Sequence, residues 1–280
     1  MGSYEYVFII GAAKCGTTAL ADLIGGHPQV SLSHPKEPDF FTNVGIERGF
    51  EWYDSCFHQK LDCRYRLDAS VSYSAGWEGG SKIIANRIFD FSPRAKIIYV
   101  VRDPVSRAWS SYWHSKRNLK EQGSFESILN DPNSDHITAG QFYQRVSEYL
   151  EFFPRENLLV LTQHNISLQP QDTLNEVFSF LGLNTVSVPD TKLNRKVNNS
   201  YQFSSIGYAV LKVIPLSLVK KLAFWANRNM PEWFNRSIRN FVGNPMPEIP
   251  DESAKAAARI FKDELQIFEN EFDVRIRKDI

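Results

Sequence analysis

A glycine-bounded loop near the start of the chain combines residue types that bind anions. Residues 7–20 read VFIIGAAKCGTTAL, with Lys14 inside the loop and Thr17 at its exit. The four apolar residues before the loop predict a buried strand, and the residues after Gly16 predict the start of a helix. Backbone N–H groups and the helix dipole would then point at one place, where a phosphate or a similar anion fits. A glycine-rich turn also occurs for backbone reasons alone, so a second motif is needed.

A second strand-to-helix junction carries an arginine and a serine. Residues 96–112 read KIIYVVRDPVSRAWSSY, in which Arg102 follows an apolar strand. Asp103 is a suitable N-cap, and the proline after it suits the first helical position. Ser110 comes eight residues after Arg102, about two helical turns along, on the side from which it can face the guanidinium. The pair predicts a second anion site, and the alternative for an isolated arginine here is an ion pair at the sheet edge.

These two segments resemble the cofactor motifs of sulfotransferases that use 3′-phosphoadenosine 5′-phosphosulfate (PAPS). Further segments follow in the order found in the branch that contains the heparan sulfate sulfotransferases and their bacterial relatives. They are HPQV at 27–30, KEPDFF at 36–41, FFPRENLLVL at 152–161 and FLGL at 180–183. The resemblance extends over roughly residues 5–185. It implies an α/β, P-loop-like three-layer sandwich, in which a central parallel sheet has helices on both faces.

The resemblance assigns the donor to two groups of residues. The 3′-phosphate is expected at Arg102 and Ser110, because a planar guanidinium holds a phosphate through two hydrogen bonds. The movable ammonium of Lys14 suits an oxygen whose charge changes during the reaction, so it would stabilise the leaving phosphate. The residues expected around the 5′-phosphosulfate are Lys14, Cys15, Gly16, Thr17 and Thr18.

The general base is expected in the segment KEPDFF, where the heparan-type branch has a glutamate. The matching residue is Glu37. A carboxylate within hydrogen-bond reach can accept the proton that an acceptor hydroxyl loses as its oxygen attacks sulfur. The alternative for Glu37 is a surface carboxylate in a proline-flanked loop. His34 and His114 are further catalytic candidates, His34 because cytosolic members of the wider family use a histidine base.

One segment departs from the family pattern. Many heparan-type members have a lysine in a segment like EKTPAY, whereas residues 68–73 read DASVSY and place Ala69 at the lysine position. Either Lys14 acts alone at the sulfuryl group, or another cation takes the place of that lysine. The candidates for the replacement are Lys36, Arg195 and Lys196.

Charge and composition limit the acceptor. The chain has 32 basic and 32 acidic residues, so its net charge is zero. A polyanionic glycan or nucleic acid usually requires a basic surface, so we expect a small-molecule, lipid or saccharide hydroxyl and no nucleic acid. Ser70, Ser72 and Tyr73 either line the acceptor pocket or end a strand and turn. The sulfuryl group carries one negative charge that fixed donors can stabilise, so no metal is expected to be required.

The length of 280 residues predicts one large α/β domain spanning residues 1–280. An alternation of apolar runs and helical patterns predicts a parallel sheet with helices on both faces. The strands are expected near 6–11, 65–69, 96–101 and 157–162. The helices are expected near 16–26, 80–90, 104–118, 140–152 and 171–182.

The carboxyl-terminal part of the chain predicts more helices. Residues 200–245 are aromatic, basic and apolar, and they predict two amphipathic helices that pack on the core, cover the acceptor cleft as a lid or touch a membrane surface. Charged residues interrupt this apolar run, so no membrane span is expected. The last helix, near 252–272, is expected to dock through Ala256, Ile260, Leu265, Phe268 and Phe272.

The cysteine content bears on the compartment. Three cysteines at ordinary spacing predict neither a disulfide framework nor a metal site, so we expect a cytoplasmic protein. The first predicted strand begins too close to the amino terminus to leave room for a signal peptide. The cysteine content and the position of the first predicted strand therefore both favour the cytoplasm.

The leading hypothesis is a PAPS-dependent sulfotransferase that acts on a hydroxyl by in-line displacement and releases 3′-phosphoadenosine 5′-phosphate (PAP). One alternative is a P-loop small-molecule kinase that uses ATP and magnesium. Thr17 stands where the kinase motif requires lysine, which argues against that alternative. A second alternative is a nucleotide-binding homologue without turnover.

Overall fold

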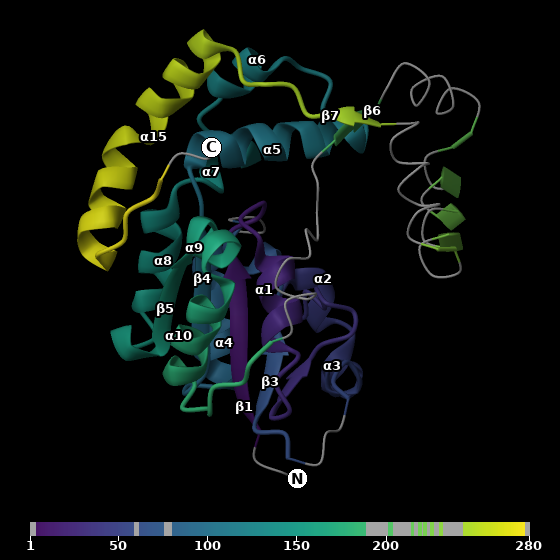
Figure 1. The fold of residues 1–280 in the computed structure, drawn as a ribbon, viewed down its shortest axis with the longest axis vertical. Helices are drawn as coiled ribbons and strands as arrows, with labels where there is room; N and C mark the ends of the chain where they lie inside the picture. The colour runs from purple at the N-terminus through teal and green to yellow at the C-terminus, as the bar shows by residue number, and fades with distance from the viewer. Residues whose placement is uncertain are drawn as a thin grey trace.

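A five-stranded parallel sheet lies at the centre of the molecule, with helices on both faces (Figure 1). The computed structural model describes residues 4–58, 62–75, 80–188, 201–203 and 243–277, together with isolated positions between 214 and 231. The fold class expected from the sequence is confirmed. In spatial order the strands are β2 (Val30–Leu32), β3 (Tyr65–Asp68), β1 (Glu5–Gly11), β4 (Lys96–Val101) and β5 (Leu158–Thr162).

The central strand β1 is apolar because both of its faces are buried. Its residues Val7 to Ile10 are completely buried, and β1 pairs in parallel with β3 on one side and β4 on the other. A strand in this position has no face for polar side chains, which explains why its sequence does not alternate. The other expected strands also lie where the sequence predicts them. β2 escaped prediction, since a strand of three residues is too short to produce a pattern.

The chain connections place the helices in two layers. α1 (Thr17–Ile24) leads from β1 past β3 to β2, whereas α4 (Ser81–Phe91) leads from β3 past β1 to β4, in the opposite direction. Right-handed crossovers that run in opposite directions lie on opposite faces of a sheet. α10 (Pro170–Phe180) packs against α1, and α8 (Phe142–Leu150) packs against α4. The sequence predicts all four of these helices, and the structure confirms them.

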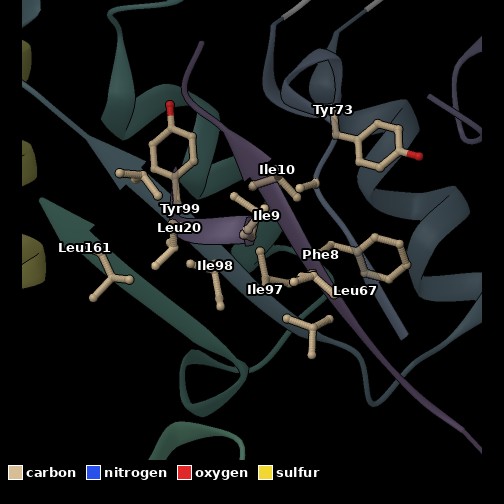
Figure 2. Packing of buried hydrophobic residues seen from close by; sticks show 14 of the residues in the cluster. Phe8, Ile9, Ile10, Leu20, Leu67, Tyr73, Ile97, Ile98, Tyr99 and Leu161 are labelled. Carbon is tan, nitrogen blue, oxygen red and sulfur yellow. The ribbon is translucent and has the colours of Figure 1, made fainter. Parts of the chain in front are cut away.

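The main hydrophobic core joins the sheet to these helices. Figure 2 shows side chains from neighbouring strands gathered with Leu20 of α1 in one cluster. Phe8 of β1 lies beside Tyr73, and their ring centroids are 6.3 Å apart. Tyr73 belongs to the short helix η1 (Val71–Ser74), which follows β3. The core therefore fixes the end of β1 relative to the segment after β3.

A second hydrophobic cluster forms around α5 (Pro104–Arg117), the helix that follows β4. Figure 1 shows α5 lying across the carboxyl end of the sheet, beside the long helix α15 (Asp251–Phe272). Asp103 is the N-cap of α5, as predicted, and its carboxylate accepts a hydrogen bond from the Ser106 N–H at 2.9 Å. The members of this cluster are Ala108, Trp109, Tyr112, Phe125, Ile128, Ile137, Ala257 and Phe261.

The last helix is present, but the predicted docking face is partly wrong. Phe268 and Phe272 are buried as predicted, whereas Ile260 is 40% exposed. Ala257 and Phe261 are buried in place of Ala256 and Ile260, which turns the docking face by one residue at the amino-terminal half of the helix. The physical reason is the second cluster, where the aromatic ring of Phe261 fills more space than Ile260 would.

The segment 200–245 lies mostly outside the described residues, and so does the prediction that it forms two amphipathic helices. Its ends pair as a short antiparallel ribbon of β6 (Tyr201–Phe203) and β7 (Gly243–Pro245). Among the isolated positions that are described, Leu218, Leu222 and Trp225 are exposed. No helix within the described part of the chain is long and apolar enough to cross a membrane.

The remaining described elements are short and connect the sheet to its helices. They are α2 (Asn43–Ile46), α3 (Gly49–Ser55), α6 (Phe125–Leu129), α7 (Asp135–Thr138), η2 (Arg155–Asn157) and α9 (Gln163–Leu168). α2 and α3 follow directly after the segment 36–41, which contains the expected base.

Candidate functional site

The loop between β1 and α1 has the backbone of an anion-binding turn. Gly16 is the N-cap of α1 and has a φ of 90°, in the left-handed region that a residue without a Cβ adopts at little cost. Lys14 is also left-handed, with a φ of 72°. The loop is tied down at its start, where Ala12 N–H donates to the Val100 carbonyl of β4 at 2.7 Å. The positive end of the α1 dipole therefore opens at the carboxyl edge of the sheet.

Arg102 brings the second motif to this loop. It follows β4, the neighbour of β1, and its Nη1 donates a hydrogen bond to the Lys14 carbonyl at 3.3 Å. The carboxyl ends of adjacent parallel strands meet at the same sheet edge, so the topology explains the contact. The two segments singled out in the sequence thus lie together, although nearly ninety residues separate them.

The ammonium group of Lys14 lies in a positive environment. Burial lowers its pKa to about 8, with further lowering by the guanidinium groups of Arg117 and Arg102, while Cys15 and Glu37 raise it. Like charges disfavour the protonated amine, whereas an anion placed among these cations would favour it. Lys14, Arg102 and Arg117 therefore form a positively charged site that is suited to a bound anion.

The other residues expected at the donor lie on the same two elements. Cys15 is buried in the loop, while Thr17 is buried and Thr18 half-buried at the start of α1. Ser110 is 2% exposed and lies on the buried side of α5, two turns after Pro104. Its pairing with Arg102 around a phosphate stays a prediction, as do the roles of the loop residues.

Glu37 lies in the exposed part of the segment 36–41. Its Oε1 is 2.6 Å from the Nζ of Lys36, and its side chain is 43% exposed. Glu37 is close enough to Lys14 for its charge to raise the pKa of that amine. A carboxylate with solvent access is therefore present near the amine of Lys14, and its role as a base stays a prediction.

The two candidate histidines have different surroundings. His34 is exposed and its ring is stacked near that of His58, with centroids 6.5 Å apart. His114 is exposed on α5, where its Nδ1 lies 3.0 Å from Nη2 of Arg117. His114 is thereby linked to the cation beside Lys14, whereas the contact described for the His34 ring is with His58.

The residues after β3 hold the segment 36–41, named the base segment here because it contains the expected base Glu37, rather than present free hydroxyls. Asp68, fully buried, accepts hydrogen bonds from the hydroxyls of Ser70, Tyr73 and Tyr53 at 2.7, 2.8 and 3.0 Å. Burial raises the pKa of Asp68 to about 7, although the three hydroxyl donors lower it. Ser72 donates to Asp39. The sequence left two roles open for Ser70, Ser72 and Tyr73. Because their hydroxyls are bonded to Asp68 and Asp39, the structure supports the role in which they end the strand and form the turn.

Three functional candidates escaped the sequence analysis. Arg117 follows Ser110 by seven residues, the spacing at which side chains return to the same helix face, so the signal was present. Asp68 ends β3, which lies next to β1, so its position at the functional sheet edge was also a signal. Asp39 lies two residues after Glu37, and no sequence pattern showed its contacts.

The cation that would replace the family lysine has a candidate in Arg117. Ala69 is completely buried after β3, as the departure in the sequence indicated. Lys36 is engaged with Glu37, and Arg195 and Lys196 lie outside the described residues. Arg117 is the cation whose charge lowers the pKa of Lys14 most, so it joins the three candidates named from the sequence.

The parallel sheet, the turn after β1 and the arginine after β4 define the class: an α/β protein with an anion-binding type of turn at the carboxyl edge of its sheet. Residues 5–210 match the family model described as the sulfotransferase domain, which is well over half of the chain. The chain therefore belongs to the sulfotransferase domain family. The resemblance in its motifs is confirmed at that level.

Curated relatives show which branch is similar. Human heparan sulfate glucosamine 3-O-sulfotransferase 6 is 30% identical over 190 residues, covering 65% of this chain and 54% of that protein. Bifunctional heparan sulfate N-deacetylase/N-sulfotransferase 1 from Caenorhabditis elegans is 27% identical over 196 residues, covering 63% and 22%. The chain thus spans about half the length of the first relative and less of the second.

Solved structures of sulfotransferases share the fold. The sulfotransferase from Alicyclobacillus acidocaldarius superposes with a TM-score of 0.63 at 22% identity, covering 99% of this chain and 98% of that one. Sulfotransferase STF9 from Mycobacterium avium superposes with a TM-score of 0.53 at 12% identity, covering 100% and 79%. At these identities the likeness is one of fold.

Proposed function

We propose that the protein transfers the sulfuryl group of PAPS to a hydroxyl of a small-molecule or saccharide acceptor. The observation that carries this proposal is the placement of Lys14. Its ammonium belongs to the turn before α1, where the cations Arg117 and Arg102 and the carboxylate of Glu37 are all close enough to shift its pKa. A donor anion and a base are thereby both assigned to the surroundings of one amine.

The donor would bind along the carboxyl edge of the sheet. The 5′-phosphosulfate is assigned to the loop from Lys14 to Thr18, where α1 contributes its N-terminal N–H groups and its dipole. The 3′-phosphate is assigned to Arg102 and Ser110, since a guanidinium and a hydroxyl can together satisfy its oxygens. Sulfotransferase family membership supports this assignment.

The transfer step needs one proton acceptor and one group that stabilises the leaving oxygen. The acceptor hydroxyl oxygen attacks sulfur and gives its proton to the Glu37 carboxylate, while the bond between sulfur and the bridging phosphate oxygen breaks. The electron pair of that bond leaves with PAP. Lys14 donates a hydrogen bond to the leaving oxygen, and its lowered pKa makes the ammonium a stronger donor. Truncating Lys14 to alanine should lower kcat by about 10²- to 10³-fold.

The first relative supports a hydroxyl acceptor, and the charge of the chain supports an acceptor of low charge. The first relative is named a glucosamine 3-O-sulfotransferase, and this chain shares 30% identity with it. The net charge of zero favours an acceptor with little charge of its own. We therefore assign a saccharide or small-molecule hydroxyl, and we keep the whole chain, 1–280, as one functional domain.

The first experiment measures the melting temperature with PAP, and with ATP plus magnesium for comparison. A ligand that binds the folded state alone must raise the melting temperature, so PAP at 100 times its Kd should stabilise by about 2.7 kcal/mol. Arg102→Ala should remove most of the shift. Arg94→Ala is the matched control, because Arg94 is exposed and precedes β4 at the opposite end of the strand. A shift with ATP and magnesium but none with PAP would support the kinase, and a PAP shift without turnover on any acceptor would support a non-catalytic homologue.

The base is tested by turnover in Glu37→Gln. We expect kcat to fall by about 10²- to 10⁴-fold, because the amide cannot accept the proton, while the PAP shift stays unchanged. Glu47→Gln is the control, since Glu47 is exposed after α2. Full turnover in Glu37→Gln would exclude Glu37 as the base and direct attention to His114.

A further inference from the structure

Asp39 has an unusual backbone conformation close to the proposed base. It lies two residues after Glu37 and has a φ of 52°, in the left-handed region. L-residues other than glycine occupy that region at a cost, and Asp and Asn tolerate it better than most. Such a conformation persists where surrounding contacts hold it, and it is often found at functional sites.

Three hydroxyl groups hold Asp39 from different elements. Its N–H donates to Ser70 Oγ at 3.1 Å, and Ser72 Oγ donates to its Oδ1 at 2.5 Å. Thr42 Oγ1 donates to its carbonyl oxygen at 2.7 Å. The backbone and the carboxylate are therefore both fixed, which accounts for the left-handed conformation.

These contacts anchor the base segment to the sheet. Ser70, which accepts from the Asp39 N–H, donates in turn to buried Asp68 at the end of β3. On the other side, a Cβ at Gly45 would lie 1.9 Å from the Asp39 carbonyl oxygen, so α2 packs directly on the backbone of Asp39. The segment that carries Glu37 is thus clamped between η1 and α2.

Resting on the proposed function, we propose that Asp39 is a positioning residue for Glu37: its hydrogen bonds to Ser70 and Ser72 fix the base segment at the distance from Lys14 that transfer requires. Asp39 itself touches no reacting atom in this proposal. Two properties of the residue at position 39 matter. It must offer an oxygen that accepts the hydrogen bond from Ser72, and it must tolerate a positive φ. Both properties are shared by asparagine, so the negative charge is not what the position needs.

The charged groups that face Asp39 are consistent with a role that does not depend on charge. Burial raises the pKa of Asp39 and the nearby Glu37 carboxylate adds to this, whereas the Ser72 and Ser70 hydroxyls and Lys36 lower it. Asp68 is linked to Asp39 through Ser70 and is itself buried. Because Asp39 is beside two other carboxylates, replacing it with a neutral amide removes a repulsion and keeps the hydrogen bonds.

The test compares Asp39→Ala with Asp39→Asn on the full chain. We expect Asp39→Ala to lower kcat by about 10²-fold, since small misplacement of a catalytic group has effects of that size, and to leave the melting shift caused by PAP unchanged. Asp39→Asn should restore kcat to within about threefold of the wild type with the same pH profile. Asp90→Asn, an exposed carboxylate on α4, is the matched control.

The remaining outcomes decide the inference. Wild-type kcat in Asp39→Ala would overturn it, and so would equal losses in Asp39→Ala and Asp39→Asn, which would show that the charge is required. If Asp39→Ala fails to fold, Ser72→Ala is measured in its place. A loss of kcat is expected in that variant, and an unchanged kcat would overturn the inference. Glu37→Gln separates the two proposals: if it keeps full turnover, the base and its positioning residue fall together. If it loses turnover while Asp39→Ala keeps it, the positioning role alone falls.

Discussion

Cationic side chains at the carboxyl edge of the sheet set the charge of the candidate site. Lys14, Arg102 and Arg117 come from the loop after β1, the end of β4 and the end of α5. Burial and the two arginines lower the pKa of the Lys14 amine to about 8, which keeps it mainly protonated at neutral pH. The Lys14 amine therefore loses its charge just above neutral pH, and any stabilisation of a leaving phosphate is lost with it.

The pH dependence of kcat/KM for the donor tests this arrangement. Because kcat/KM reports the free enzyme, it should fall as pH rises through about 8, where Lys14 loses its proton. Arg117→Gln removes a positive neighbour, so the pKa of Lys14 should rise and the basic limb of the profile should move to higher pH. Arg94→Gln is the control, with an unchanged limb expected. A limb that stays in place in Arg117→Gln would contradict the assignment of Arg117 to the site.

At the scale of elements, α15 completes the amino-terminal end of α8. Gln141, the N-cap of α8, makes no side-chain cap, and Glu264 of α15 takes that role instead. Its Oε1 accepts hydrogen bonds from the N–H groups of Tyr143 and Gln144, the second at 3.3 Å. A carboxylate at this place also complements the positive end of the helix dipole. α15 thus stabilises α8, one of the helices that cover the sheet.

Removing this cap should destabilise the protein. Glu264→Ala leaves two N–H groups of α8 without their acceptor, and we expect the free energy of unfolding to fall by about 1–2 kcal/mol. Glu264→Gln keeps an acceptor oxygen and should cost less. Urea denaturation of both variants and the wild type measures the difference. Equal stability of Glu264→Ala and the wild type would show that α15 does not cap α8.

At the scale of the whole molecule, two hydrophobic clusters share one chain. The main cluster lies around the sheet, and the second joins α5, α6, α7 and α15. α5 belongs to the second cluster and is also the helix that carries Ser110 and Arg117. The candidate donor site therefore takes residues from elements of both clusters.

A pair of neighbouring residues on α15 tests the packing of the second cluster. Phe261 is buried there, so Phe261→Ala should lower the free energy of unfolding by about 3–5 kcal/mol. Ile260 is 40% exposed, so Ile260→Ala should change it by less than about 1 kcal/mol. Thermal unfolding measures both, and one shared transition is expected for a single domain. Equal losses in the two variants would contradict the assignment of Phe261, and not Ile260, to the docking face.

The cellular location is a separate prediction at this scale. The cysteine content favours the cytoplasm, and the curated relatives that match are longer than this chain. We keep the cytoplasmic location as a proposal. Fractionation of cells that express the natural gene tests it, and recovery of the protein in a membrane or secreted fraction would contradict it.

The sequence by itself determined the features that depend on near neighbours. The strand, glycine-bounded turn and helix around Lys14, and the capped helix after Arg102, are local patterns, so both were predictable and both are present. The parallel order of the main strands followed from their alternation with helices. The charge total was also fixed by composition, and the motifs in their order identified the family.

Tertiary structure alone decided which distant side chains share the site. The approach of Arg117 to Lys14, the clamp on Asp39 and the face of α15 each join residues that are far apart in the chain. Sequence periodicity shows that a helix has an apolar side, but it cannot show whether Phe261 or Ile260 meets the core, since that depends on the shape of the partner surface. Hydrogen-bond partners such as Ser70 and Ser72 are likewise set by how the loops fold over the sheet, because a hydroxyl on a turn can bond in many directions until packing selects one.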